Sequence, residues 1–171
     1  QKQLIEGRRI VIEHLVALLD RDKRTICVRM KADQTKYRTI VLLGEYRAAE
    51  GVDGILDNFF YGFGETSREM MPWPAPPSVK TLTQIGLPAT RKILQRLEIA
   101  EIEESVKFVT VSNKEIWGAQ LKQWHIVNYY REIFRDVYGS EWDEMLKAMI
   151  DKAGKEKKEL LSKNLKLLLK E

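Results

Sequence analysis

The first third of the chain combines one helical hydrophobic pattern with two that are typical of strands. Residues 3–20 carry apolar side chains at the spacing of an amphipathic helix. Residues 24–31 alternate in polarity, residues 36–43 form a second β-rich run, and residues 33–35 between them suit a tight turn. The pattern therefore predicts a helix and a β-hairpin, followed by a shorter aromatic segment over residues 55–63.

Prolines mark a division of the chain. Four of its five prolines lie in the stretch Pro72–Pro77, and proline fixes φ and removes an amide donor, so this stretch is expected to be extended and stiff. We interpret residues 72–77 as a linker that separates an N-terminal extension, residues 1–71, from everything that follows.

The residues after the linker predict a small β-α-β-α-β core, residues 78–133. The expected strands are 78–83, 106–111 and 126–130, and the expected helices are 89–97 and 114–124. Pro88 suits the first position of the earlier helix, and Ser112 with Glu115 matches a capping box at the start of the later one. The predicted fold class is thus α+β: a three-stranded sheet with two helices on one face, plus a helix–hairpin extension before it and a helical extension over residues 134–171.

Composition narrows the class of protein. The chain has 171 residues, is 44% hydrophobic and has a net charge of only +4, so it can bury a core, and a nucleic-acid partner is permitted but not required. Its single cysteine, Cys27, cannot form an internal disulfide, which suggests a reducing or redox-indifferent compartment. No apolar run approaches the roughly 20 residues of a membrane span. The start at Gln1 is compatible with removal of a leader segment, which the sequence alone does not decide.

Candidate catalytic and metal-ligating residues are not clustered along the sequence. His14 and His125 are far apart and there is one cysteine, so zinc-type spacing does not occur. Residues 62–64 read Gly-Phe-Gly but lack the downstream lysine of a phosphate-binding loop. We therefore expect no enzymatic activity, no cofactor, no metal and no small-molecule substrate.

Several short motifs in the predicted core share the order and spacing of a known family. They are Lys80–Thr83, Ile85–Pro88, Leu94, Leu97, Ile99, Val106, Ile116–Gly118 and His125–Val127. In this order the segment 78–133 resembles the L-thirty family of large-subunit ribosomal proteins. Two departures affect the family's RNA contacts: Thr83 and Gln84 lead directly into Ile85 where the family carries an Arg-Ser pair, and Glu98 replaces a glycine.

The resemblance implies a structural constituent of the large ribosomal subunit that binds rRNA through its core and neighbouring ribosomal proteins through its extensions. The candidate RNA-binding residues are Lys80, Gln84, Gly86, Arg91, Lys92, Arg96, Lys114, Gly118 and Lys122. Long, nearly neutral extensions resemble those of mitochondrial ribosomes, so a mitochondrial location is expected, with a plastid or bacterial ribosome as the alternatives.

Each of these residues also has an ordinary structural explanation. Arg91, Lys92 and Arg96 fit the solvated side of an amphipathic helix equally well. A glycine within a helix costs about 1 kcal/mol relative to alanine, so Gly118 indicates either the close approach of RNA or another backbone, or a tolerated packing position.

Two other functions remain open from the sequence. In a winged-helix DNA-binding protein, residues 81–98 would form a helix-turn-helix with Gly86 at the turn, residues 89–97 would be the recognition helix and residues 106–111 a wing. A scaffold protein without nucleic-acid contacts is the third possibility. A helix over residues 78–84 would contradict the sheet and favour the winged-helix alternative.

Overall fold

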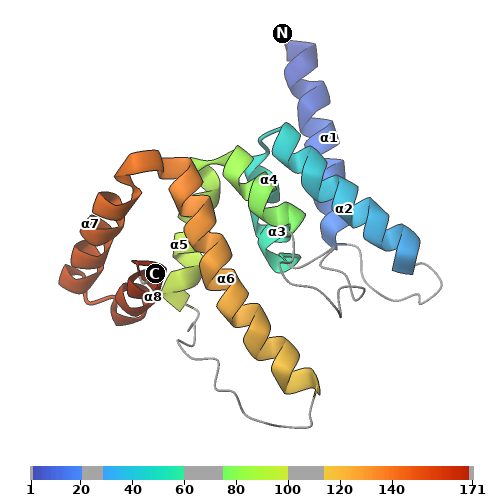
Figure 1. Ribbon diagram of the computed structural model, residues 1–171. Helices are drawn as coiled ribbons and strands as arrows, with labels where there is room; N and C mark the ends of the chain where they lie inside the picture. The colour runs from blue at the N-terminus through green and yellow to red at the C-terminus, as the bar shows by residue number, and fades with distance from the viewer. Residues whose placement is uncertain (1, 21–28, 60–74, 100–113, 170–171) are drawn as a thin grey trace. The chain divides into compact units, whose positions relative to one another are not determined.

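The computed structural model describes residues 2–20, 29–59, 75–99 and 114–169, and in these ranges every regular element is a helix (Figure 1). For residues 2–3, 20, 29–34 and 114–125 the description is limited to the backbone. The chain divides into two compact units, Gln1–Ala89 and Thr90–Glu171, which we call the N-terminal and C-terminal units.

The N-terminal unit is organised around its second helix. Its elements are α1 (Lys2–Asp20), α2 (Arg29–Glu45), the 3-10 helix η2 (Ala49–Gly51), α3 (Val52–Asp57) and α4 (Pro77–Ile85). Helix α2 packs against both α1 and α4. The fully buried side chains between these helices include Leu19, Ile40, Leu43, Ile55 and Leu82, and burial of this apolar surface is the main stabilising term.

Helices α2 and α4 approach most closely at a glycine. A Cβ atom on Gly44 would lie 3.1 Å from the Cα of Thr81 and would collide with the side chain of Gln84. The Thr81 hydroxyl donates a hydrogen bond of 3.1 Å to the carbonyl of Ile40. The absence of a side chain at Gly44 therefore lets the two backbones come close enough for this bond.

The C-terminal unit contains most of α5 (Leu87–Ile99), then α6 (Lys114–Tyr138), the 3-10 helix η3 (Gly139–Glu141), α7 (Trp142–Lys155) and α8 (Glu159–Leu169). Helix α8 packs against both α7 and α6. Its last carbonyls, those of Leu167 and Leu168, accept hydrogen bonds of 3.1 and 2.9 Å from the guanidinium of Arg131 on α6, which satisfies groups that a helix end leaves unpaired. The buried side chains include Ile93, Leu97, Ile133, Phe134, Leu146, Leu165 and Leu168.

The predicted α+β fold with a three-stranded sheet is wrong. The first expected strand, residues 78–83, lies in helix α4. Val79, Leu82 and Ile85 recur every three residues and are all buried, so the segment has helical periodicity. Pro77 at the first turn and Gly86 after the last supply the usual boundaries of a helix.

The other β-rich runs are also helical where they are described. The run 36–43 lies in α2, where Lys36, Thr39, Ile40 and Leu43 are buried at the i, i+3, i+4, i+7 spacing of a helix face. The Thr39 hydroxyl donates to the carbonyl of Thr35 at 2.8 Å, a bond that accommodates a β-branched residue in a helix. The expected hairpin turn at 33–35 is therefore part of α2.

The third expected strand, residues 126–130, continues helix α6, which runs without interruption to Tyr138. His125, which directly precedes that expected strand, is likewise a helical residue. The helices expected over 3–20 and 89–97 are confirmed as α1 and α5, and the helical C-terminal extension as α7 and α8. The expected strand 106–111, the Ser112 cap and residues 60–63 and 72–74 lie outside the described residues.

A candidate nucleic-acid interface on helix α5

The sequence-predicted site residues are distributed over three helices and one connection. Lys80 and Gln84 are exposed on α4, in the N-terminal unit, and Gly86 follows that helix. Lys114, Gly118 and Lys122 occupy the first half of α6, where only the backbone is described. Arg91, Lys92 and Arg96 are the three that the structure brings together, on α5.

Gly86 joins two consecutive helices. It follows Ile85, the last residue of α4, and precedes Leu87, the first residue of α5. Its φ of 78° lies in the left-handed region that favours glycine. Its amide donates to the carbonyl of Leu82 at 3.0 Å, and its own carbonyl accepts from the amide of Ala89 at 2.9 Å, so the same residue ends one helix and begins the next.

The rest of the C-terminal unit buries one face of α5. Thr90, Ile93 and Leu97 are each at most 1% exposed. The hydroxyls of Thr90 and Tyr138 on α6 are hydrogen-bonded at 2.9 Å. This face fixes the rotation of α5 about its axis and thereby determines which side chains point to solvent.

Two contacts, one from within α8 and one from the residue before it, hold the end of α5. The buried amide of Asn164 donates to the carbonyl of Leu97 at 2.6 Å. The ammonium of Lys158 forms an ion pair with Glu98 at 2.9 Å and a second with Glu156 at 3.2 Å. Hydrogen bonds to Glu98 and then Glu156 raise the pKa of Lys158. Glu98, the acid at this end of α5, is thus already engaged by a cation.

The outward face of α5 carries cations and an amide. Arg91 and Gln95 are exposed one helical turn apart, and Lys92 and Arg96 beside them are half-buried. Arginine and glutamine are side chains that hydrogen-bond to guanine and adenine edges in the major groove. Gln95 was not among the predicted site residues, although its i, i+4 spacing from Arg91 is visible in the sequence.

Arg96 also belongs to the interior of its unit. Burial raises the pKa of Tyr130 to about 12, and the nearby positive charge of Arg96 opposes this shift. Because Arg96 lies close to a buried tyrosine, substituting it would disturb packing as well as charge. Substitutions of the exposed Arg91 and Gln95 therefore test the function of this face with less effect on packing.

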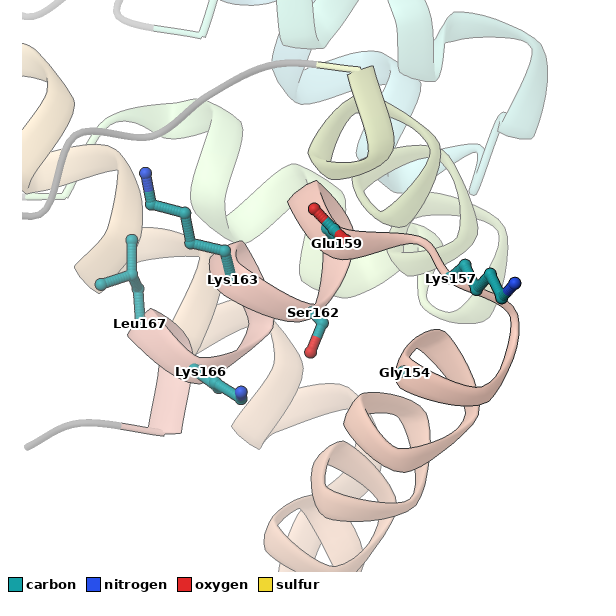
Figure 2. A pocket seen from close by; sticks show the side chains of 7 residues that line it. All are labelled: Gly154, Lys157, Glu159, Ser162, Lys163, Lys166 and Leu167. Atoms are coloured by element: carbon teal, nitrogen blue, oxygen red, sulfur yellow. The ribbon is translucent and has the colours of Figure 1, made fainter.

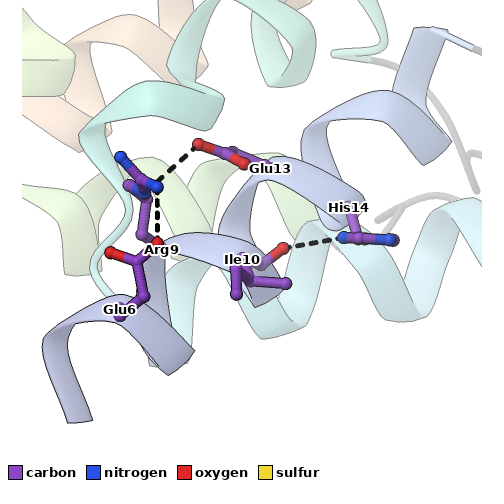
Figure 3. Close-up of polar contacts among 5 residues, drawn as sticks. All are labelled: Glu6, Arg9, Ile10, Glu13 and His14. Carbon is purple, nitrogen blue, oxygen red and sulfur yellow. Dashed lines mark hydrogen bonds and ion pairs between the residues drawn. The ribbon is translucent and has the colours of Figure 1, made fainter. Parts of the chain in front are cut away.

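The polar groups of α1 form local contacts. Arg9 pairs with Glu6 at 2.5 Å and with Glu13 at 3.6 Å, and Nδ1 of His14 donates to the carbonyl of Ile10 at 2.8 Å (Figure 3). Such exposed pairs within one helix contribute about 0.3–0.5 kcal/mol each. His14 therefore has a structural hydrogen-bond partner within its own helix.

The structure offers no metal or membrane-spanning site in the part of the chain that it describes. No group of three or more His, Cys, Asp or Glu residues there could hold a metal ion. No helix in the same ranges is long and apolar enough to cross a membrane.

Comparisons with protein-family models, with curated proteins and with solved structures found no match for this chain. What bears on function is therefore the order of α4, Gly86 and α5 along the chain and the exposed face of α5.

Proposed function

We propose that the protein is a helix-turn-helix DNA-binding protein of the winged-helix kind, with α5 as its recognition helix. The observation that carries this proposal is the direct succession of α4, Gly86 and α5, with an outward face of α5 that bears Arg91, Lys92, Gln95 and Arg96. In helix-turn-helix proteins the second helix enters the major groove and its exposed side chains contact the bases.

The connection is shorter than in most motifs of this type. A helix-turn-helix usually has about three to four residues between its helices, and here Gly86 alone separates the assigned bounds. Helix bounds from different criteria commonly differ by one or two residues. Here the amide of Gly86 bonds back to Leu82 and its carbonyl accepts from Ala89, so the turns on both sides of Gly86 are assigned to the helices. Gly86 has a positive φ of 78°, a backbone conformation common in turns between helices.

Loss of the predicted sheet removes the main support for the ribosomal assignment. The motifs at the two ends of the resemblance were expected in strands of the core, and residues 78–83 and 126–130 are helical. Binding to the large ribosomal subunit, an rRNA partner and a mitochondrial location stay predictions. The basic face of α5 suits either nucleic acid, whereas the helix preceding it favours the DNA alternative.

Selection from a pool of random duplexes at low salt tests the proposal. The wild-type chain is expected to enrich a preferred sequence and to lose affinity steeply as salt rises, because bound cations release counterions from DNA. Arg91→Ala and Gln95→Ala should each reduce discrimination between the selected and a scrambled duplex by about 10- to 100-fold. Lys147→Ala, an exposed position on α7, is the control and should leave discrimination unchanged.

The opposite results would identify the alternatives. Co-sedimentation with large ribosomal subunits, without selection of any duplex, would contradict the proposal and support the ribosomal function. Failure of both assays would leave a scaffold protein.

A further inference from the structure

A groove with lysines along it lies between the end of α7 and helix α8. Its volume is about 430 Å³, and it is lined by Gly154, Lys157, Glu159, Ser162, Lys163, Lys166 and Leu167 (Figure 2). Figure 2 shows the side chains of Ser162 and Lys166 directed into the space beside Gly154, while Lys157 and Lys163 point outward from its margins. A Cβ at Gly154 would meet nothing within 4 Å, so the wall opposite α8 is open.

Lys157 occupies an unusual backbone position in this groove. Its φ is 57°, a left-handed conformation in which glycine is the preferred residue. The amide of Lys157 donates to the carbonyl of Gly154 at 3.2 Å, and the amide of Lys158 donates to the carbonyl of Ala153 at 2.9 Å. These two bonds are the pattern of a Schellman motif at a helix C-terminus. The backbone conformation favours glycine and so does not account for a lysine at this position. The positive charge of the side chain is the property that sets Lys157 apart from glycine.

The charge of the groove is positive despite one acid at its edge. Lys157, Lys163 and Lys166 are all exposed, against the single carboxylate of Glu159 in the first turn of α8. A carboxylate in the first turn of a helix interacts favourably with the helix dipole. The hydroxyl of Ser162 adds a group that can donate to an anionic oxygen.

The groove belongs to the same unit as the outward face of α5. The segment that forms it is attached to the end of α5 through Lys158, which pairs with Glu98, and through Asn164, which bonds to Leu97. The backbone that carries these cations is therefore held at a fixed position relative to Arg91 and Gln95. Contacts to the DNA backbone need such a fixed position, because they set the orientation of the helix that contacts the bases.

We infer that this groove binds the sugar–phosphate backbone of the duplex that α5 contacts, with Lys157 and Lys166 on phosphate oxygens. The inference rests on the proposed function and extends it by naming a second surface, whose contacts supply affinity without sequence preference.

The chain offers a matched control for Lys157. Arg47, at the end of α2 in the N-terminal unit, also has positive φ, 48°, and is exposed. Its amide bonds to the carbonyl of Gly44, and the next amide bonds to that of Leu43, both at 2.9 Å. Lys157→Gly and Arg47→Gly thus remove one cation each and relieve the same backbone conformation.

The experiment compares two double variants, Lys157→Gly with Lys166→Gln in the groove, and Arg47→Gly with Lys147→Gln outside it. Both should unfold at the wild-type temperature or above. We expect the groove variant to bind the selected and the scrambled duplex more weakly by a similar factor, about one to two orders of magnitude near 0.1 M salt. The slope of log affinity against log salt should become shallower by about two in this variant only.

The outcomes separate this inference from the proposed function. Equal salt slopes in the two double variants would overturn the inference, while the effects of Arg91→Ala and Gln95→Ala would still support α5 as the recognition helix. A loss of affinity in the groove variant, with no effect of the two α5 substitutions, would support the groove and contradict the recognition helix. Absence of duplex binding by the wild-type chain at low salt would overturn both.

Discussion

Tyr130 shows how a single residue of α6 connects the core of the C-terminal unit with the exposed face of α5. Its side chain is only 5% exposed, and burial disfavours the charged phenolate, which raises the pKa of Tyr130 to about 12. Arg96, on the half-buried edge of α5, partly offsets this effect. Neutral Tyr130 is thus part of the folded state over the whole physiological range.

This buried phenol should make stability fall in alkaline solution. In the unfolded chain Tyr130 loses its proton near its ordinary pKa of about 10, whereas in the folded chain it keeps the proton to about 12. Between these values the unfolded state binds fewer protons, so the free energy of unfolding decreases as the pH rises, by up to about 3 kcal/mol. Urea titrations from pH 9 to 11.5 should show this decrease in the wild type and a smaller one in Tyr130→Phe.

An exposed tyrosine provides the comparison. Tyr37 on α2 is 48% exposed, and Tyr37→Phe is the control for removal of one phenol hydroxyl from the surface. The raised pKa of Lys158 also removes stability as the pH rises above its ordinary value of 10.5, in all three proteins alike. Identical profiles for Tyr130→Phe and the wild type would contradict the assignment of the alkaline loss to Tyr130.

At the scale of elements, one buried amide contributes a specific hydrogen bond to the attachment of α8 to α5. Asn164 is fully buried and donates to the carbonyl of Leu97 in the last turn of α5. Asn164→Ala would leave that buried carbonyl without its donor and should lower the free energy of unfolding by about 1–3 kcal/mol. Hydrogen exchange should become faster at the end of α5 while the first turns of α7 keep their protection.

The conservative variants sharpen this expectation. Asn164→Asp keeps the shape of the side chain but presents an acceptor to the carbonyl, so it should be at least as destabilising as alanine. Ser162→Ala, at a half-buried position on the same helix, should change stability by less than about 0.5 kcal/mol. Wild-type stability in Asn164→Ala would show that the bond contributes nothing.

Helices could be predicted from the sequence where hydrophobic spacing and boundary residues agree. Residues 3–20 and 89–97 have clear apolar stripes, and both are helices. In residues 78–83 and 36–43, Val79, Thr81, Thr39 and Ile40 suggested strands, because β-branched residues prefer extended backbone. Burial of Leu82 and Leu43 against neighbouring helices overrides that local preference, and tertiary burial cannot be read from a short segment.

The candidate site was predicted in part. Arg91, Lys92 and Arg96 do share one helix. The sequence could not show that Thr90, Ile93 and Leu97 would be buried by α6 and α8, which is what exposes Gln95. The lysines of the α7–α8 groove are separated by several positions along the chain and come together only through the left-handed turn at Lys157.

At the scale of the whole molecule, the chain has two separate sets of fully buried side chains. Ile40, Leu43, Ile55 and Leu82 belong to the N-terminal unit, and Ile93, Ile133, Leu146 and Leu165 to the C-terminal unit. Because contacts cluster within each unit, a cavity in one set removes packing energy from that unit directly.

Matched cavity substitutions in the two cores should therefore have separate effects. Ile40→Ala and Ile133→Ala each truncate a side chain that is 0% exposed, and each should cost about 2–5 kcal/mol. Native-state hydrogen exchange should lose protection in α2 and α4 for Ile40→Ala, and in α6 and α8 for Ile133→Ala. Equal loss of protection in all four helices after either substitution would show that the two cores unfold as one cooperative unit. If the cores unfold separately, the proposed DNA binding should be more sensitive to Ile133→Ala, since α6 contacts the buried face of α5 through the Thr90–Tyr138 hydrogen bond.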